Sequence, residues 1–428
     1  MNHSILAIAA VLAFARTVAL AQPLIPPDTD FSKFANKYVW QQSPQYLQEE
    51  SRKVAGENRV ESKVPPYTLP DMFKLASGAP VRSVADWDGP SRAELLELFR
   101  SEIYGYAPPK PNNLTFKTVE SDPKAMGGKA TLKRIAISFQ LNGDPFTFHL
   151  ILFVPNQRRG NAPVFLTLNH RPPNNTDPTR KIQSEYWPAE YVVSRGYAIA
   201  AINVADEVDP DKNNAPTGIR VFYRDHGHQY TWGAIGAWAW SASRAMDYLA
   251  TDPDINPARV AVIGHSRTGK TSLWAGAQDT RFSLVCVNEA GESGPALARR
   301  DFGETVAMIT KSFPYWFSPK YATYANRVDA LPVDQHELVA LVAPRAYHGG
   351  DASLDFHADP RGSWLALVEA SKVWALDKAA TKPMPADMPR VNDLYLNGPI
   401  AYHIREGGHA LTTFDWKLYL DHADTIWK

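Results

Sequence analysis

The sequence contains almost no cysteine, because among its 428 residues only Cys286 carries a thiol. One thiol cannot close an internal disulfide, which excludes a small domain held together by cross-links. A chain of this length can instead rely on a large buried core. Cys286 lies in the apolar run FSLVCVN, and this setting predicts a buried strand residue without a catalytic role.

An excess of one charge sign is also missing, because 45 Lys and Arg residues balance 45 Asp and Glu residues. A polyanion or an anionic membrane surface would favour a basic excess. We therefore expect no nucleic-acid partner and a small or neutral substrate. After the first residues, no stretch reaches the roughly 20 apolar residues that span a bilayer, so we expect no membrane span.

The amino-terminal residues combine an apolar run at 5–15 with the triplet ALA at 19–21. This pattern is typical of a signal peptide over residues 1–21, so we expect cleavage after it and a periplasmic or extracellular location. Residues 22–80 are polar and contain proline without strong periodicity. We expect them to wrap the core as an arm, and residues 81–428 to form a single domain.

Apolar periodicity predicts alternating strands and helices along this domain. Residues 91–104 have apolar side chains at helical spacing, with Ser91 and Glu94 as a capping box. Asn142-Gly143 predicts a tight hairpin. Further strands are expected at 130–141, 145–155, 162–170 and 197–204, helices at 187–196 and 232–255, and a strand, turn and helix at 259–278. Continuous apolar strands alternating with helices predict an α/β fold of three layers, with a mostly parallel central sheet covered by helices.

Residues 264–271, GHSRTGKT, fit two incompatible patterns. They match the phosphate-binding loop G-x-x-x-x-G-K-[ST], but Gly264-His265-Ser266 also fits the strand-to-helix turn that presents a nucleophilic serine in α/β-hydrolases. A nucleotide hydrolase needs a later strand that ends in Asp for magnesium, and none follows. The predicted export argues against a nucleotide as well. We therefore favour the serine nucleophile, although the spacing G-x-S-x-x-G is one residue longer than usual.

The partners of a serine nucleophile follow it in the order acid then histidine. His409 lies in a Gly-Gly loop directly after a predicted strand, where the base is expected, whereas His403 within that strand is expected to be structural. Two carboxylates remain candidates for the acid. Glu289 ends the strand after the serine helix, and Asp355 follows the next strand.

Two basic residues follow the candidate nucleophile. The backbone N–H of Arg267 is the expected oxyanion donor, and its guanidinium is either a second stabiliser or a structural ion-pair partner. Lys270 lies one helical turn after the serine and is expected to hydrogen-bond substrate hydroxyls. His226 and His228 form an isolated histidine pair without a zinc motif, so we expect no catalytic metal.

Several blocks of the chain resemble the glucuronoyl esterases, carbohydrate esterase family 15, in order and at plausible spacing. Residues 264–305 resemble the core signature G-[CH]-S-R-x-G-K with its following strand and R-R-x-x-G-E run. Residues 341–364 and 407–416 resemble the family's later blocks, and residues 83–108 resemble the leading region of its bacterial members. The likeness covers about residues 65–428.

The resemblance implies an α/β-hydrolase that cleaves the ester between (4-O-methyl-)glucuronic acid of xylan and a lignin alcohol. It implies Ser266 as nucleophile, His409 as base and Arg267 as oxyanion stabiliser. Glu289 and Asp355 match the two alternative positions of the acid.

The resemblance also implies a sugar-binding pocket. Lys270 and Glu304 match positions that contact the sugar hydroxyls, and His357 stands where the family usually has tryptophan. This departure keeps an acetyl or feruloyl xylan esterase as an alternative, and a non-catalytic carbohydrate-binding protein as a weaker one. We expect a monomer that needs no cofactor.

Overall fold

A central sheet of ten strands organises the computed structural model, which describes residues 40, 56–206, 218–377 and 381–427. The strands are β1 Thr115–Lys124, β2 Ala130–Leu141, β3 Asp144–Pro155, β4 Ala162–Asn169, β5 Ala198–Asn203, β6 Ile255–His265, β7 Leu284–Asn288, β8 Ala346–Ala352, β9 Leu394–Asn397 and β10 Ile400–Arg405. Their order in the sheet is β1-β2-β3-β5-β4-β6-β7-β8-β10-β9. The six central strands, β5-β4-β6-β7-β8-β10, pair in parallel, whereas β1, β2, β3 and β9 pair antiparallel at the two edges.

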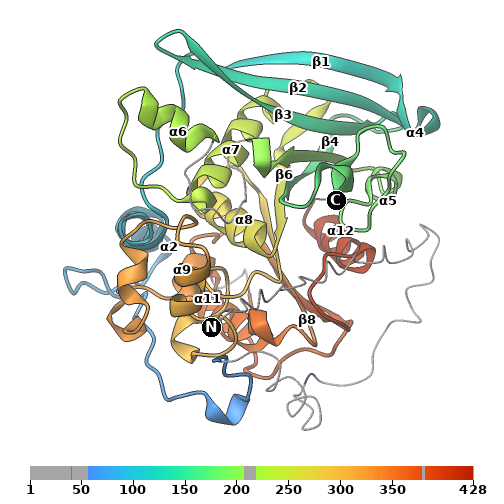
Figure 1. The fold of residues 1–428 in the computed structure, drawn as a ribbon. Coiled ribbons are helices and arrows are strands. Elements are labelled where there is room, and N and C mark those ends of the chain that lie inside the picture. Colours follow the sequence, from blue (N-terminus) through green and yellow to red (C-terminus); the bar gives the residue numbers. More distant parts are fainter. Residues whose placement is uncertain (1–39, 41–55, 207–217, 378–380, 428) are drawn as a thin grey trace, which may run out of the picture.

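Helices cover both faces of this sheet (Figure 1). The α-helices are α2 Val84–Asp86, α3 Arg92–Phe99, α4 Ala125–Gly128, α5 Ala189–Ser194, α6 Gly218–Asp225, α7 Ala234–Leu249, α8 Arg267–Gln278, α9 Val306–Ser312, α10 Gln335–Ala340, α11 Pro360–Trp374 and α12 Thr413–Trp427. The short 3₁₀ or π segments are η2 Glu61–Lys63, η3 Trp87–Ser91, η4 Arg100–Tyr104, η5 Pro173–Thr176, η6 Val204–Asp206, η7 Ala298–Arg300, η8 Tyr321–Tyr324, η9 Val328–Ala330 and η10 Phe356–Ala358. Helices α7, α8 and α11 lie against one face and α5 and α12 against the other, which gives the expected three layers.

Alternation along the strands separates two apolar clusters, one on each face of the sheet. In β4, Leu166 and Leu168 belong to the cluster under α7 and α8. Phe165, directly before Leu166, belongs to the opposite cluster and contacts Trp416 of α12 at 5.8 Å between ring centroids. Because successive strand side chains point to opposite faces, an unbroken apolar strand supplies both clusters at once. Cys286 of β7 is buried in the second cluster, as expected.

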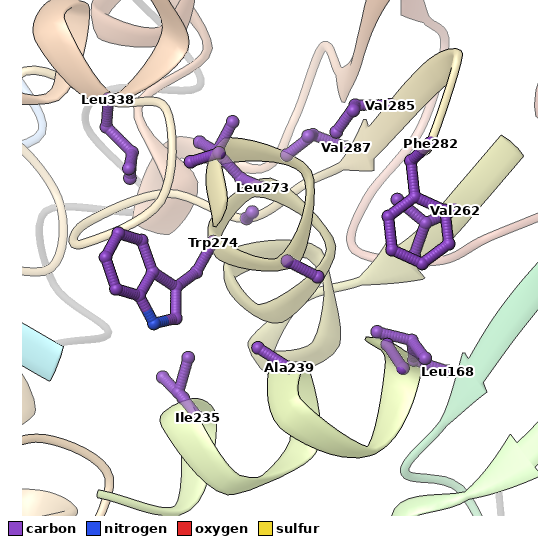
Figure 2. Close-up of a cluster of buried hydrophobic side chains, with 14 of the residues drawn as sticks. Leu168, Ile235, Ala239, Val262, Leu273, Trp274, Phe282, Val285, Val287 and Leu338 are labelled. Carbon is purple, nitrogen blue, oxygen red and sulfur yellow. The ribbon is translucent and has the colours of Figure 1, made fainter. Parts of the chain in front are cut away.

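Helix α8 is packed between the sheet and its neighbouring helices (Figure 2). Leu273 points toward β7, while Trp274 points away from the sheet, toward Ile235 of α7 and Leu338 of α10. The Trp274 ring also stacks on Tyr104, with centroids 4.4 Å apart and planes at 17°. This burial fixes the position of the helix that begins directly after Ser266.

The structure corrects the predicted start of the first helix. Ser91 has helical backbone angles of φ −63° and ψ −49° and caps nothing with its side chain, because the break in the helical backbone lies earlier, at Gly89 (φ −86°, ψ −106°). The Glu94 carboxylate instead accepts a hydrogen bond from the backbone N–H of Ala76. The expected capping box is therefore wrong, and the helical segment continues to Tyr104 in a π-helical turn.

Other local predictions agree with the structure in part. The Asn142-Gly143 hairpin joins β2 to β3, with positive φ angles of 52° and 96°. Strand β1 was not expected, because most of its residues are polar and nearly all are exposed. It pairs with β2, and its Phe116 packs against Tyr248 of α7 at 5.5 Å between ring centroids. The long helix predicted to residue 255 ends at Leu249.

The predicted signal peptide and most of the predicted arm lie outside the described residues. Trp40 is described, and its indole N–H donates to the carbonyl of Ser353 at 3.0 Å. Residues 56–80 run along the domain and form a short bridge between Lys74 and Pro80. In the part of the chain that the structure covers, no helix is long and apolar enough to cross a bilayer.

Replacing Trp274 with alanine should destabilise the fold strongly. The substitution removes the stack on Tyr104 and leaves a large buried cavity, so the free energy of unfolding should fall by about 3–5 kcal/mol. Guanidinium chloride titration followed by tryptophan fluorescence and far-UV circular dichroism measures this loss. Leu396→Ala is the matched control, because Leu396 is 45% exposed and should cost about 0.5 kcal/mol or less. Equal stability of the two variants would contradict the packing described for α8.

Candidate functional site

Four side chains that the sequence singled out follow neighbouring parallel strands. Ser266 follows β6, Glu289 follows β7, Asp355 lies in the loop after β8 and His409 lies in the loop after β10. These strands are adjacent in the sheet and run in the same direction. The carboxyl ends of parallel strands meet at one edge of the sheet, where α/β folds place their ligands. The structure therefore brings the four residues to one site.

Ser266 occupies a strained turn between β6 and α8. Its backbone angles are φ 57° and ψ −126°, a region that non-glycine residues rarely adopt. A Cβ on Gly264 would lie 1.9 Å from the carbonyl oxygen of Thr268, and a Cβ on Gly269 would lie 2.8 Å from Ala290. Only glycine fits at these two positions, so the glycines of the motif allow the sharp turn. Among the described residues the Ser266 hydroxyl has no hydrogen-bond partner in the protein.

His409 faces two carboxylates with the same ring nitrogen. Its Nδ1 lies 2.6 Å from Oδ2 of Asp355 and 3.2 Å from Oε2 of Glu289. Burial alone would lower the pKa of His409, but hydrogen bonds and charge from Asp355 and then Glu289 outweigh it and raise the pKa. The arrangement commits Nδ1 to the carboxylates and leaves Nε2 free to exchange a proton with another group.

The two carboxylates differ in their surroundings. Burial raises the pKa of Glu289, and the attraction of Arg405 only partly offsets it. Burial also opposes ionisation of Asp355, but its hydrogen bond to His409 holds its pKa below the usual value. Asp355 is therefore the carboxylate that stays charged beside the imidazole, and it is also the nearer of the two.

Arg405, which the sequence reasoning missed, connects Glu289 to the loop that carries His409. Its Nη2 donates to Glu289 Oε1 at 2.6 Å and to the carbonyls of Gly408 at 2.6 Å and Ala410 at 2.7 Å. The backbone N–H of Ala410 donates to the other Glu289 oxygen at 2.9 Å. The guanidinium and the carboxylate together fix the backbone on both sides of His409. The available signal was a charged residue at the end of a predicted buried strand.

His403 belongs to a buried network behind this loop. Its Nε2 lies 2.9 Å from Asp415 and its Nδ1 lies 3.0 Å from Nε2 of His348. Asp415 also accepts a hydrogen bond from Nε of Arg405 at 3.1 Å. The His403 ring is fully buried, which agrees with the structural role expected for it.

A cavity of about 250 Å³ opens beside Ser266. Its lining comprises Ser266, Arg267, Lys270, Glu289, Ala290, Gly291, Glu304, Phe313, Trp316, His357, Ala358 and His409. Larger hollows exist, such as one of about 590 Å³ that includes Gln278 and Arg281. That hollow lies at the carboxyl end of α8, the opposite end from Ser266. The smaller cavity is therefore the one that a reacting group would use.

Arg267 lies over aromatic rings. Its guanidinium carbon is 4.8 Å from the ring centroid of Trp316 and 5.5 Å from that of Phe313. In the part of the chain that the structure describes, this guanidinium forms no ion pair, so the structural pairing considered from the sequence is not observed. The Arg267 backbone N–H is the first of α8 and has no helical acceptor. Both groups lie at the cavity wall, where positive charge favours an anion.

Lys270 and Glu304 form a second charged pair at the cavity. The Lys270 ammonium donates to the carbonyls of Ala290 at 2.5 Å and Glu292 at 2.6 Å and lies 3.6 Å from Glu304. Burial lowers the pKa of Lys270, and the nearby carboxylates oppose this effect. An ammonium bound by two carbonyls is poorly placed to hold nucleotide phosphates. The geometry therefore agrees with rejecting the phosphate-loop interpretation.

His357 lies at the same wall, in η10. Its Nε2 is 3.6 Å from Glu304, and its Nδ1 bonds Glu57 at 2.8 Å. The structure thus places all eight predicted residues around one cavity, since Asp355 reaches it through His409.

One group at this site has the spacing of a metal centre. Ligand atoms of Glu289, Asp355 and His409 lie within 4.8 Å of one another. However, Glu289 already accepts from Arg405 and from a backbone N–H, and a guanidinium beside a cation would repel it. The donor set therefore fits an imidazole held by carboxylates better than a bound metal. Within the described residues, His226 and His228 belong to no such group.

Known proteins match this chain along most of its length. A family model described as glucuronyl esterase of fungi matches residues 137–376. The carbohydrate esterase MZ0003 from an unknown prokaryotic organism is 38% identical over 402 residues, which cover 86% of this chain and 92% of the relative. The 4-O-methyl-glucuronoyl methylesterase 1 of Wolfiporia cocos is 32% identical over 303 residues and 66% of each chain.

Solved structures agree with these sequence matches. The glucuronoyl esterase of Solibacter usitatus has a TM-score of 0.80 at 35% identity and covers 86% of this chain and 100% of its own. A promiscuous esterase of carbohydrate esterase family 15 from a marine bacterial metagenome has a TM-score of 0.78 at 37% identity, with 86% and 99% covered. The predicted family and α/β-hydrolase fold are confirmed. The chain belongs to the glucuronoyl esterase family and is a carboxylic ester hydrolase.

Proposed function

We propose that the chain is a serine esterase that hydrolyses the ester between (4-O-methyl-)glucuronic acid of xylan and a lignin alcohol. The observation that carries the proposal is the strained turn that presents Ser266 to the same cavity as His409, whose Nδ1 is held by Asp355 at 2.6 Å. Relatives named 4-O-methyl-glucuronoyl methylesterase support the choice of substrate. The family membership already supports hydrolysis of a glucuronic ester, and the serine mechanism is the finer part of the proposal.

The reaction begins when His409 accepts the proton of the Ser266 hydroxyl as its oxygen attacks the ester carbonyl. The negative charge that develops on the carbonyl oxygen is stabilised by the backbone N–H of Arg267 and by its guanidinium, which has no competing carboxylate partner among the described residues. The protonated His409 then donates its proton to the leaving alcohol. In the second half of the reaction His409 accepts a proton from water, whose oxygen attacks the acyl carbon. His409 then returns the proton to the Ser266 oxygen as its bond to glucuronate breaks.

Asp355 is the better candidate for the triad acid. It lies closer to His409 Nδ1 than Glu289 does, and its pKa stays low while burial raises that of Glu289. The bonds from Arg405 and Ala410 use Glu289 to hold the loop. Glu289 acts as a reserve because its second oxygen remains within 3.2 Å of the imidazole.

The acyl group of the substrate fits the polar side of the cavity. Lys270, Glu304 and His357 lie around a space next to Ser266 and offer donors and an acceptor to sugar hydroxyls. An acetyl or feruloyl ester remains the second candidate, since His357 presents less apolar surface than the tryptophan usual in the family. Residues 1–21 support export of the protein, because their pattern is typical of a signal peptide.

Hydrolysis of benzyl glucuronate by the purified protein tests the main proposal. The wild type should cleave it faster than 4-nitrophenyl acetate or methyl ferulate, and Ser266→Ala should lower kcat by at least about 10³-fold, because the nucleophile is lost. Circular dichroism confirms that the variant is folded. Cleavage of the acetyl or feruloyl ester alone, still dependent on Ser266, would move the substrate assignment to the second candidate.

Substitution of the two carboxylates tests their assignment. Asp355→Asn should lower kcat/KM on the order of 10²-fold, less than for a lone triad acid because Glu289 still faces the imidazole. Glu289→Gln should lower kcat/KM by roughly tenfold or less and also reduce the melting temperature. A larger kinetic loss in Glu289→Gln than in Asp355→Asn would reverse the assignment.

The pH dependence of these variants gives an independent measurement. The base must be neutral to accept a proton, so a raised pKa of His409 places the acidic limb of kcat/KM at a higher pH than for a free imidazole. Asp355→Asn removes the closer negative charge, which lowers the pKa of His409 and should move that limb to lower pH. A limb that stays in place would show that Asp355 does not act on the base.

A further inference from the structure

A carboxylate from the amino-terminal arm reaches the candidate cavity. Glu57 Oε1 accepts a hydrogen bond from His357 Nδ1 at 2.8 Å, and its other oxygen lies 2.5 Å from Nε of Arg59. The Glu57 side chain is only 1% exposed, whereas His357 is 45% exposed toward the cavity. A buried carboxylate is costly unless it is paired, so this contact is a specific pairing across 300 positions of the chain.

The residues that follow Glu57 fasten the arm close to Glu304 and His357. The carbonyl of Asn58 accepts from the N–H of Gly303 at 2.8 Å. Glu61 pairs with Arg300 at 2.7 Å and with Arg361 at 3.0 Å. These bonds hold residues 57–61 in register with the segments that lead to Glu304 and His357.

Glu304 and His357 are in turn tied to each other. The N–H of Glu304 donates to the carbonyl of His357 at 2.9 Å, and the Glu304 carboxylate lies 3.6 Å from His357 Nε2. A Cβ on Gly303 would lie 2.5 Å from the carbonyls of Phe356 and His357, so the two loops are in close backbone contact. The arm, the Glu304 loop and the His357 turn form one connected wall of the cavity.

The charges around His357 determine whether its imidazole ring is protonated on one nitrogen or on both. Burial alone would lower its pKa, but Glu304 and Glu57 outweigh burial and raise the pKa to about 9. Asp355 on the same turn is a third carboxylate whose charge acts on the ring. The positive charge of Lys270 acts on Glu304, and the Arg59 guanidinium pairs with Glu57. At neutral pH the ring is therefore an imidazolium with a proton on each nitrogen.

We propose that Glu57 is a positioning residue for substrate recognition, which keeps His357 turned so that Nε2–H and the Glu304 carboxylate face the acyl group as a donor and an acceptor. The pair selects an acyl group with neighbouring hydroxyls, a pyranose ring, over an acetyl or a planar aromatic group. This inference rests on the proposed function, because it takes a sugar to occupy the cavity.

The charge of Glu57 is central to this arrangement. A neutral imidazole carries one proton, and Glu57 would draw it to Nδ1. Nε2 would then be an acceptor that faces the Glu304 carboxylate, and the donor offered to the substrate would be lost. Glu57→Gln keeps an oxygen that accepts from Nδ1–H but removes the negative charge, so it tests the charge with little change of shape.

Titration of the histidine ring protons by NMR tests the pairing without substrate. The His357 signal, identified by its absence in His357→Gln, should titrate near pH 9 in the wild type and about one pH unit lower or more in Glu57→Gln. Glu61→Gln is the matched control, because Glu61 fastens the same arm to Arg300 and Arg361 but does not line the cavity. It should leave the His357 titration in place. An unchanged titration in Glu57→Gln would overturn the proposal.

Steady-state kinetics test the role in recognition. At pH 9, a drop of about one unit in the pKa of His357 would reduce its protonated fraction from about one half to about one tenth. Glu57→Gln should therefore raise KM for benzyl glucuronate roughly three- to fivefold at this pH, through loss of one hydrogen bond, with a much smaller change in kcat. The preference for benzyl glucuronate over 4-nitrophenyl acetate should fall by the same factor, whereas Glu61→Gln should retain it. A parallel loss of kcat on both esters would show that Glu57 has only a structural role and would overturn the proposal.

The two proposals can fail separately. A wild type that cleaves benzyl glucuronate, with the same KM in Glu57→Gln, would overturn the inference about Glu57 and leave the proposed function intact. A wild type that does not cleave benzyl glucuronate would overturn the proposed function, and the assignment of Glu57 to sugar recognition with it.

Discussion

Parallel hydrogen bonding among β6, β7, β8 and β10 is the constraint on which the site depends. Each of these strands contributes one side chain, and the side chains meet because the strands end at the same edge of the sheet. The residues themselves are far apart in the sequence. Apolar packing on both faces, including that of α8 in Figure 2, holds the strands in this register. The geometry of the site therefore depends on the packing of the core.

Charges at the site are buried in pairs and networks, so each one depends on its partners. Arg405 bonds Glu289, Asp415 and two loop carbonyls, and Glu289 bonds the loop that carries His409. An unpaired charge in this environment would be costly. Glu289 and Arg405 are buried as a pair, and their bonds to the loop backbone hold His409 in place. Surface loops without such bonds are usually more mobile.

The sequence was sufficient for features that rest on local patterns. Unbroken apolar runs predicted the parallel strands, and small residues around Ser266 predicted the sharp turn, because steric limits act between near neighbours. The capping box at Ser91 failed because the helix begins before Ser91, after a backbone break at Gly89. Arg405 and Glu57 were missed because their partners lie 116 and 300 positions away. No local pattern records such contacts, and only the folded sheet and the docked arm reveal them.

The docked arm bears on the order in which contacts form during folding. Glu57 belongs to the first part of the chain, yet it bonds residues that come near the end, so its contact has one of the longest loop closures in the fold. The turn at Ser266, the sheet and the loop that carries His409 all consist of residues after 81. The hydrolytic residues and the proposed recognition contact of Glu57 therefore belong to different parts of the chain. With the role proposed for Glu57, a substitution in the arm changes the choice of substrate while every residue that carries out hydrolysis stays the same.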